Sequence, residues 1–501
     1  MSMIRLVLAC VLVVGICISC DSPVEGPQYG DLVPSSTDSA AIAWNPLFVL
    51  SGGDSLISAP PAADEGISAV KEAIANRTEA QNKAIRTWNT GTYLRWNELT
   101  RNIVARYNVA PLAERTPNGT FTGRFLPDPN KPFASPPFTA RLYALVNAGQ
   151  YDALIWAWRL KYQHRRPAPS TVDPTIVTAG PSSGTPSYPN EDAVVSRVTV
   201  EIVSFFYPGE RAYLEAQLQE CTSSRVAAGL ARPSDIAGGD SLGRRVAALL
   251  IDRAKNDGFS KADDQARWKA VDAAMVTTWP KWRSTETPTR PPMLPFFGEV
   301  KPWNITDAAS FDPGPPPSEG TAVYDTDMDE MRSISVGRTR EQIRIANYWS
   351  DGEGTFTPPI HWHLFAAERL REARFSMIRM ARVMAYTSTS LHDAAVVCWY
   401  TKYKYNTARP ITIDNVVRMP IGLPNFPGYS SGHSTFSGAA ATVLGHFFPS
   451  YSQGYMMMAR EAGDSRVYGC IHVRIDCTVG LKQGQDIGAV AVARAVQDGA
   501  E

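Results

Sequence analysis

Two histidines in the C-terminal part of the chain have neighbours that suit acid–base or nucleophilic chemistry. His433 follows Ser431 and Gly432 in "GYSSGHSTF", a small-residue turn before an apolar stretch that predicts a helix. His472 lies four residues before Asp476. On a helix, that carboxylate can hydrogen-bond one ring nitrogen and leave the other free to attack or to bind a ligand. His433 is then available as general acid or base on the opposite side of the same centre.

Three cations belong to sequence segments around these histidines. Lys402 and Arg409 lie in "KYKYNTARP", and Arg466 lies in "SRVYGC". Together with the backbone N–H groups of Ser431 and Gly432 at a helix start, they predict a site for a compact tetrahedral oxyanion, phosphate or vanadate. Such an anion needs many donors because its charges are costly to desolvate. The alternative is that each cation belongs to a solvated helix surface.

The motifs of this region recur in the same order in the N-terminal half. The segments "LHDA", "KYKYNTARP", "GYSSGH", "FFPS" and "SRVYGCIHVRID" correspond to "QYDA", "KYQHRRP", "SYPNED", "FFYP" and "SRVAAGLARPSD". The spacing agrees too, because 33 residues separate Asp192 from Arg225 and 33 separate His433 from Arg466. This repetition predicts two homologous helical bundles in tandem.

The two copies differ where chemistry is expected. The first copy has Asn190-Glu191-Asp192 where the second has Ser431-Gly432-His433, and Ala231 where the second has His472. The N-terminal copy lacks both histidines and is predicted to be a scaffold. Only the C-terminal copy is expected to have an intact active site.

Helical periodicity dominates the chain, and β-branched alternation is scarce, so the predicted fold class is all-α. Helices are expected near 138–162, 190–206, 210–230 and 239–256, and again from about 327 to the end. The proline- and aromatic-rich stretch between the halves predicts an ordered crossover. The expected organisation is a signal peptide over 1–20, a flexible tether over 21–63, an N-terminal bundle over 64–277, a crossover over 278–326 and a catalytic bundle over 327–501.

Composition and the N-terminus bear on partners and location. The 501 residues include 49 basic and 49 acidic side chains, and a net charge of zero does not favour a nucleic-acid partner. The apolar run from Leu6 to Ile18 is short for a membrane span and typical of a signal peptide. The "CISC" tetrad resembles a bacterial lipobox with Cys20 as the lipidated residue. An exported protein of the bacterial cell envelope is expected, lipid-anchored at the periplasmic or cell surface, with plain secretion as the alternative.

Export would permit disulfides among the remaining cysteines. If His472 opens a helix, Cys470 lies on the preceding loop and can reach either Cys477 or Cys398. Either bond would brace the segment that contains His472. The alternative is that these thiols are reduced and buried as small core residues.

Three separated motifs carry a family resemblance. They are Lys402–x6–Arg409-Pro410, Ser431-Gly432-His433, and Ser465-Arg466–x5–His472–x3–Asp476. In order and internal spacing they resemble the signature motifs of the superfamily of type 2 phosphatidic acid phosphatases (PAP2) and vanadium-dependent haloperoxidases. The second motif departs from the pattern, with Ser430 where proline is usual. The tandem layout resembles the soluble two-bundle haloperoxidase branch found in bacteria, rather than the membrane-spanning lipid phosphatases.

The resemblance implies a role for each motif residue. The equatorial oxyanion oxygens would be held by Lys402, Arg409, Ser431, Gly432 and Arg466. His472 would be the axial vanadium ligand or the phosphoryl nucleophile, and His433 the acid–base residue. Trp399 and Phe426 are similar in position to aromatic residues that flank the halide site, with core packing as the alternative. Asp351, in a loop that resembles one in bacterial relatives, is expected to pair with Arg466.

Three functions follow from these residues. The first is a vanadate-dependent haloperoxidase, which oxidises halide with hydrogen peroxide. The second is an acid phosphatase that needs no cofactor and hydrolyses a phosphomonoester through a phosphohistidine at His472. The third is a non-catalytic, anchored oxyanion-binding protein. The tandem layout with Trp399 and Phe426 favours the first, and the presence of both histidines argues against the third.

Overall fold

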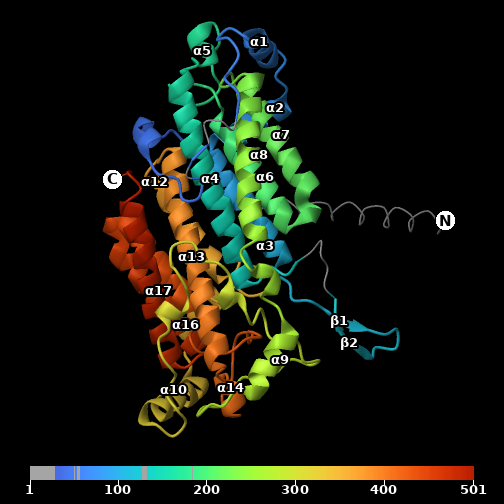
Figure 1. Ribbon diagram of the computed structural model, residues 1–501, viewed down its shortest axis with the longest axis vertical. Helices are drawn as coiled ribbons and strands as arrows, with labels where there is room; N and C mark the ends of the chain where they lie inside the picture. The colour runs from blue at the N-terminus through green and yellow to red at the C-terminus, as the bar shows by residue number, and fades with distance from the viewer. Residues whose placement is uncertain (1–28, 50, 53–56, 127–131, 183, 501) are drawn as a thin grey trace, which may run out of the picture.

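A computed structural model describes residues 29–49, 51–52, 57–126, 132–182 and 184–500 of the protein, and helices dominate it (Figure 1). The expected signal peptide and Cys20 lie outside the described residues. Within these ranges, none of the helices combines the length and apolar character that a membrane span requires.

Two long helices form the centre of the molecule. Helix α4 (Pro136–His164) packs against α13 (Met377–Tyr405), and each has 29 residues (Figure 1). Every residue is buried over 139–158 of α4 and over 380–399 of α13. A helix that is covered on all sides must be predominantly apolar all round, which both sequences are.

The same succession of helices follows each central helix. After α4 come α5 (Pro169–Val172), α6 (Glu191–Phe206), α7 (Arg211–Ala227) and α8 (Pro233–Lys255). After α13 come α14 (Pro410–Ile413), α15 (Gly432–Phe447), α16 (Ser452–Tyr468) and α17 (Arg474–Val496). The two series have the same lengths in order, namely 4, 16, 17 and 23 residues. Each helix of the second series starts 241 residues after its counterpart, as 432 minus 191 shows for α15 and α6.

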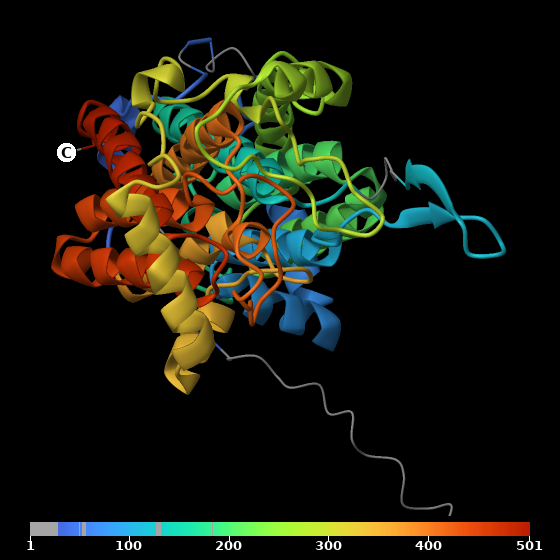
Figure 2. The ribbon, with the colours of Figure 1, turned by 90° about the horizontal axis from the view of Figure 1, so that it is seen from below.

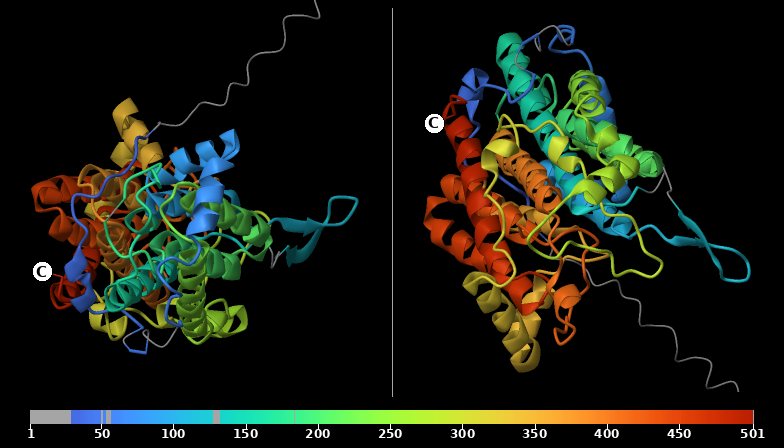
Figure 3. Two further views of the ribbon diagram at one scale, coloured as in Figure 1. Left: turned by 90° about the horizontal axis from the view of Figure 1, so that it is seen from above. Right: turned by 60° about the horizontal axis from the view of Figure 1, so that its bottom comes forward.

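Polar contacts also recur at equivalent positions of the two series. A buried ion pair occurs in each half, Arg141–Asp257 at 2.6 Å and Arg382–Asp498 at 2.8 Å. A tryptophan N–H also donates to a glutamate in each half, Trp88 to Glu220 and Trp349 to Glu461, both at 2.9 Å. Helices α4 to α8 and α13 to α17 gather on opposite sides of the molecule (Figure 3). The chain therefore uses one set of anchoring contacts twice.

The remaining helices cover these two groups. They are α1 (Ile67–Ala75), α2 (Glu79–Asn89), α3 (Thr92–Tyr107), α9 (Gln265–Ala274), α10 (Ala322–Gly337), α11 (Arg340–Tyr348) and α12 (Pro358–Glu372). Short 3₁₀ turns occur at η1 (Ser39–Ala43), η3 (Pro208–Glu210), η4 (Phe259–Lys261), η5 (Phe297–Glu299), η6 (Ala309–Phe311) and η7 (Pro449–Tyr451). Helices α2 and α11 both begin with a capping box, in which Thr78 or Thr339 pairs with a glutamine three residues on.

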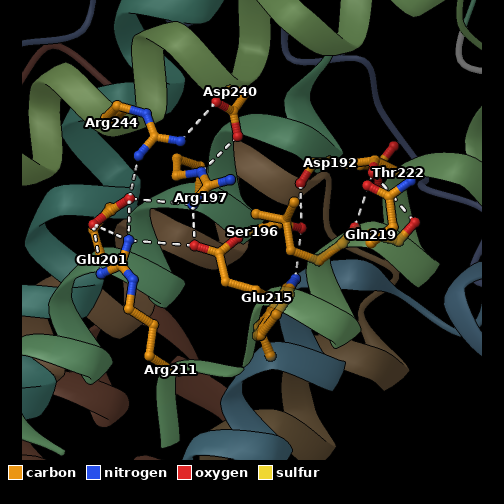
Figure 4. Close-up of polar contacts among 12 residues, drawn as sticks. Asp192, Ser196, Arg197, Glu201, Arg211, Glu215, Gln219, Thr222, Asp240 and Arg244 are labelled. Carbon is orange, nitrogen blue, oxygen red and sulfur yellow. Dashed lines mark hydrogen bonds and ion pairs between the residues drawn. The ribbon is translucent and has the colours of Figure 1, made fainter. Parts of the chain in front are cut away.

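A charge network joins α6, α7 and α8 (Figure 4). Its centre is Arg197, which contacts Glu201, Glu215 and Asp240 at 3.1, 2.8 and 2.5 Å. Arg211 and Arg244 complete the network, so three arginines face three carboxylates. Figure 4 shows Asp192 apart from these arginines, at the start of α6. The network neutralises itself and ties the helices together without a ligand.

The segment expected to be a flexible tether, residues 21–63, includes side chains that are buried against the rest of the protein. Trp44, Leu47 and Val49 are buried. The backbone N–H groups of residues 47–49 donate to the carboxylate of Asp152 in α4 at 2.6 to 2.8 Å. A buried carboxylate requires such donors, so the segment is fixed by a residue about a hundred positions away. Asp393 of α13 is held in the same manner by residues 303 and 304.

The structure differs from the sequence predictions in two places: it contains a short β-hairpin, and a helix begins within the predicted crossover. Strands β1 (Ala113–Arg115) and β2 (Phe121–Phe125) form an antiparallel hairpin that projects from the helices (Figure 2). Its two strands are too short to produce a clear alternating pattern in the sequence. Helix α10 begins inside the range expected for the crossover, because the side chain of Thr321 caps its N-terminus.

Candidate active site

The residues predicted to bind an oxyanion come from five separate segments around the start of α15. Lys402 lies in the last turn of α13, Arg409 caps α14, and Arg466 lies in the last turn of α16. Ser431 is the N-cap of α15, followed by Gly432 and His433. The turn before α17 contributes His472, and its first turn contributes Asp476. The three cations are all 1% exposed or less, so their donors are directed into the protein.

His472 is held between a carboxylate and a guanidinium. Its Nδ1 lies 2.9 Å from Asp476 Oδ2, and its Nε2 lies 2.8 Å from Arg409 Nη1. Because a guanidinium can only donate, Nε2 is the acceptor and the ring proton is assigned to Nδ1. Burial, together with Arg409 and Lys402, lowers the pKa of His472 well below its usual value. The ring is therefore neutral, as a nucleophile or ligand must be.

The contact with Asp476 matches the expected pairing, although the geometry differs from the expected one. His472 precedes α17 and lies in a turn, because the helix has Val473 as its N-cap. Burial raises the pKa of Asp476 to about 7, against the lowering effect of Lys402 and Arg409. The carboxylate therefore depends on those two cations for its charge.

His433 occupies the second position of α15 with one free nitrogen. The backbone of Trp349 and Ser350 acts on the ring and partly opposes the lowering of its pKa, whereas Nε2 is buried without a partner in the described structure. Burial, followed by the charge of Arg466, lowers the pKa of His433 well below its usual value. His433 in turn contributes to the lowered pKa of His472, so the two rings share one electrostatic environment.

Lys402 differs from the expected oxyanion donor. Its Nζ donates to the carbonyl oxygens of Pro427, Gly428 and Ser430 at 2.9, 2.7 and 2.6 Å. An ammonium group has three N–H donors, and all three are engaged by this turn. Burial lowers the pKa of Lys402 to about 7. In this structure Lys402 shapes the turn that leads into α15.

Ser431 and Gly432 differ in what their backbones can offer. The Ser431 N–H donates to the carbonyl oxygen of Asp476 at 2.9 Å, so the expectation that it is free for an oxyanion is wrong in this structure. The contact joins the start of α15 to the start of α17. Gly432 is the first helical residue, and its N–H has no acceptor within the helix. The Gly432 N–H can therefore still donate to an oxyanion, whereas the Ser431 N–H is already bonded to Asp476.

The two buried arginines are positioned by the backbone. Arg409 donates through Nε to Phe426 and through Nη1 to Ile471, whereas Nη2 is buried without a partner in the described structure. Arg466 donates to Ser465 Oγ at 2.9 Å and to the carbonyl oxygen of Ala346 at 2.8 Å. Each guanidinium is thus fixed by short contacts with neutral acceptors.

Asp351 does not form the expected ion pair with Arg466. Its carboxylate contacts Nδ1 of His361 at 3.0 and 3.1 Å. The charge of Asp351 nevertheless raises the pKa of Arg466, against a larger lowering effect of burial. His361 and Asp351 form a second buried histidine–carboxylate pair beside the site, which spacing alone did not indicate.

Trp399 and Phe426 lie together next to the cations. Their ring centroids are 5.0 Å apart, and the Phe426 ring lies 5.1 Å from both Lys402 Nζ and Arg409 Cζ. The Trp399 N–H donates to the carbonyl oxygen of Met293. The aromatic pair therefore forms an apolar wall against the charged groups. This position is compatible with a role beside a halide site and with simple core packing.

The expected disulfide brace is absent from the described residues, where all four cysteines are free and buried. Cys470 Sγ lies 2.9 Å from Arg338 Nη2, and Cys398 Sγ faces the carbonyl oxygen of Ser430. The Cys470 thiol also faces the carbonyl oxygen of Met331 in α10, and Cys470 and Cys477 belong to one buried apolar cluster without a bond between them. The reduced alternative is the one that the structure bears out.

Glycines of α17 were missed by the motif analysis. A Cβ at Gly480 would lie 2.7 Å from the Ser431 carbonyl oxygen, and one at Gly484 would overlap the Thr435 carbonyl. These glycines let α17 approach the first turn of α15 and so bring Asp476 to Ser431. Their spacing, with Gly488 four residues further on, was the available signal.

The remaining free groups suit a compact oxyanion. Arg409 Nη2 and His433 Nε2 are buried polar atoms without partners in the described structure, and buried polar atoms normally have one. Both belong to residues around His472, as does the Gly432 N–H. An anion with several oxygens would accept hydrogen bonds from Arg409 Nη2 and the Gly432 N–H and would compensate for the buried cations, and a protonated oxygen of that anion would donate to His433 Nε2.

Comparisons with known proteins show a family match and a shared fold. Residues 383–497, which contain every motif residue, match the PAP2 superfamily. The chain has the fold of a bacterial vanadium-dependent iodoperoxidase, with a TM-score of 0.60 and 20% identity over 80% of this chain and 96% of that one. Structures of apo and holo bacterial vanadium-dependent chloroperoxidase have TM-scores of 0.51 and 0.52 and identities of 16% and 15%. They cover 73% of this chain and 94% and 92% of their own. No curated protein sequence matches the chain.

Proposed function

We propose that the protein is a vanadate-dependent haloperoxidase that oxidises halide with hydrogen peroxide. One observation carries the proposal: a neutral, buried His472 lies among buried cations, with unpaired Arg409 Nη2 and His433 Nε2 nearby. The fold shared with vanadium-dependent iodoperoxidase and chloroperoxidases supports the choice of reaction.

The residues would divide the work as follows. His472 Nε2 would exchange its contact with Arg409 Nη1 for vanadium, and Arg409, Arg466 and the Gly432 N–H would hold the oxyanion oxygens. When bound, vanadate supplies Lewis-acid activation of peroxide toward halide. Asp476 holds the His472 ring by its Nδ1–H, and Lys402 supports the site through the turn 427–430.

His433 would handle the proton. Its lowered pKa keeps the ring neutral near pH 7, so Nε2 can accept a proton from peroxide and return it to a leaving oxygen. The Trp399–Phe426 wall would receive the halide. A soft anion there would gain from the adjacent Arg409 guanidinium and Lys402 ammonium.

The second candidate is an acid phosphatase, which the match to the PAP2 superfamily favours. In this reaction His472 Nε2 would attack phosphorus, forming an N–P bond as the ester P–O bond breaks. At acidic pH His433 would first take up a proton from solvent on Nε2 and would then donate it to the departing alkoxide, and water would afterwards hydrolyse the phosphohistidine. A pentacoordinate phosphoryl transition state and bound vanadate would be stabilised by the same hydrogen-bond donors, because both are five-coordinate oxyanions.

One paired assay separates the candidates. The mature chain loaded with orthovanadate is tested for peroxide-dependent halogenation of monochlorodimedone with iodide, bromide and chloride, and the apo-protein for p-nitrophenyl phosphate hydrolysis. Halogenation that requires vanadate and is lost in His472→Ala supports the first candidate. Hydrolysis without halogenation supports the second. Binding of vanadate without either activity would contradict both and favour a binding protein.

We also propose that the chain consists of two homologous bundles, of which only the second is catalytic. Equal helix lengths and the constant separation of 241 residues support a duplication. The expected export and lipidation at Cys20 remain part of the proposal. Incorporation of labelled palmitate into the wild type but not into Cys20→Ser tests the anchor.

A further inference from the structure

A cavity of about 370 Å³ lies between the N-terminal helices and the start of α13 and contains none of the proposed active-site residues. Its volume is in the range of small-molecule sites. The lining includes Lys161, Asp192 and Arg225, which precede Lys402, His433 and Arg466 by 241 residues. The cavity therefore occupies, among α4, α6 and α7, the place that the oxyanion site occupies among α13, α15 and α16.

The charges of the two sites differ at three equivalent positions. Ala168 stands 241 residues before Arg409, which removes a cation. Glu191 and Asp192 stand in the places of Gly432 and His433, which adds two carboxylates. A site with this change is unsuited to a multiply charged oxyanion.

The polar groups of the cavity are satisfied by the protein with one main exception. Lys161 is paired with Glu191 at 2.7 Å and donates to the Pro186 carbonyl oxygen at 2.6 Å. Arg225 donates to Asn89 Oδ1 at 3.0 Å, and through its other nitrogens to Ser224 and Ile85. The carboxylate of Asp192 makes no hydrogen bond or ion pair with any described residue.

A second free group and the walls point to the kind of ligand. The residue Thr92 is 2% exposed, and its Oγ1 has no hydrogen-bond partner in the described structure. The Cys221 thiol, a weak hydrogen-bonding group, lies near it. Aromatic and soft apolar side chains complete the lining, namely Trp88, Tyr93, Trp158, Phe375 and Met380. The polar atoms of Trp88, Tyr93 and Trp158 are already bonded to Glu220, Asn147 and Thr37. The rings therefore contribute apolar surface to the lining, and Lys161 Nζ lies 5.9 Å from the Trp158 ring. A carboxylate beside aromatic side chains is an arrangement that recognises an organic cation.

We propose that this cavity binds a small organic ammonium ion, with Asp192 as its counter-ion and the tryptophans as its walls. Exposed residues 33–37 and Ser182 line its rim and provide access from solvent. The site is independent of the reaction proposed for the C-terminal half, because it shares no residue with the His472 centre.

The test is calorimetric titration of the full mature chain at pH 7 with 2-phenylethylamine, 2-phenylethanol and 3-phenylpropanoate. These probes share a phenylethyl group and differ in charge. We expect the amine to bind about tenfold or more tightly than the alcohol or the acid. Asp192→Asn should weaken amine binding about tenfold, with little effect on the alcohol. Ala168→Arg, which restores the missing cation, should abolish amine binding.

Two controls keep the outcome clear. Glu201→Gln changes a carboxylate of the same helix outside the cavity and should leave amine affinity unchanged, as should His433→Ala in the other half. Thermal unfolding checks that Asp192→Asn is folded, as expected for an isosteric change at an unpaired side chain. Preference for the acid, unchanged affinity in Asp192→Asn, or failure of the amine to bind at millimolar concentration would each overturn the proposal.

Discussion

The starts of α6 and α15 have the same construction and carry opposite chemistry. Asn190 and Ser431 both cap the helix with their side chains, at 2.9 and 3.4 Å from the N–H three residues on. In each case a glycine lets a later helix approach the carbonyl oxygen of the capping residue. This glycine is Gly239 of α8 for Asn190 and Gly480 of α17 for Ser431. The next two residues are acidic in α6 and are glycine and histidine in α15. The same backbone arrangement at a helix start thus carries two carboxylates in α6 and a glycine and a histidine in α15.

The outer faces of the two helix groups are held together differently. The Arg197 network joins α6 to α7 and α8, whereas the equivalent residue of α15 is Gly438, 241 positions later. A Cβ at Gly438 would lie 2.5 Å from the Leu481 carbonyl oxygen. The C-terminal group therefore relies on close backbone packing where the N-terminal group relies on charges. Close packing leaves less freedom to the helices that carry His433 and Arg466 and to the turn that carries His472.

The largest expected effect is the loss of activity in His472→Ala. We expect kcat/KM for the activity found in the paired assay to fall by about 10³-fold or more, because the substituted residue contacts the reacting centre. The control is Asp240→Asn in the Arg197 network, which should change activity by about twofold at most. Comparable losses in both variants would mean that the two halves do not divide catalysis and support as proposed.

Matched glycine substitutions distinguish packing from catalysis. Gly484→Ala and Gly243→Ala each place a methyl group against the backbone carbonyl of the neighbouring helix, at Thr435 and Val194. Each should cost about 1–3 kcal/mol of unfolding free energy. Only Gly484→Ala should also reduce kcat per folded molecule, because it displaces the turn that contains His433. Chemical denaturation and assays on both variants measure the two effects, and equal kcat losses would contradict the comparison.

Acid should weaken the C-terminal half first. The histidines whose pKa burial lowers all belong to that half: His363, His392, His433 and His472. When the folded pKa lies below the unfolded value of about 6.5, the unfolded chain takes up protons first as pH falls. The stability that these histidines contribute is thus fully present above pH 6.5 and is lost below it, by up to about 1.4 kcal/mol per pH unit for each histidine. Asp476, whose folded pKa is raised to about 7, takes up its proton first in the folded state and offsets the loss from one of them.

Denaturant unfolding at pH 6.5 and 5.5 measures this loss, and hydrogen exchange locates it. His433→Gln/His472→Gln should show a smaller difference between the two pH values than the wild type. Exchange that accelerates first in α4 to α8 would show that the acid-sensitive groups lie elsewhere.

The smallest expected effect concerns the thiols. Burial raises the pKa of both Cys221 and Cys477 to about 12, so neither should react in the folded protein near neutral pH. Iodoacetamide should leave the native mature chain unmodified and should label four cysteines after denaturation without a reductant. Fewer than four labelled cysteines would reveal a disulfide and contradict the reduced arrangement in both halves.

The sequence by itself determined the features that depend on local spacing. Helical periodicity predicted α4, α6 and α7 to within a few residues, since a helix buried on one or more faces repeats its apolar positions. Motif order predicted that His433 and His472 belong to one site, and in the structure His433 contributes to the lowered pKa of His472. The four-residue separation also anticipated the contact between His472 and Asp476.

Only the tertiary structure decided how donors and acceptors are shared between distant segments. Lys402 uses its three N–H groups on the turn 427–430, and the Ser431 N–H is taken by Asp476, so neither is the free donor that the motif suggested. The segment 47–49 is anchored by Asp152, and the cavity beside Asp192 arises from α4, α6 and the start of α13. A buried polar group takes whichever partner the fold brings within about 3 Å, and spacing along the chain does not specify that partner.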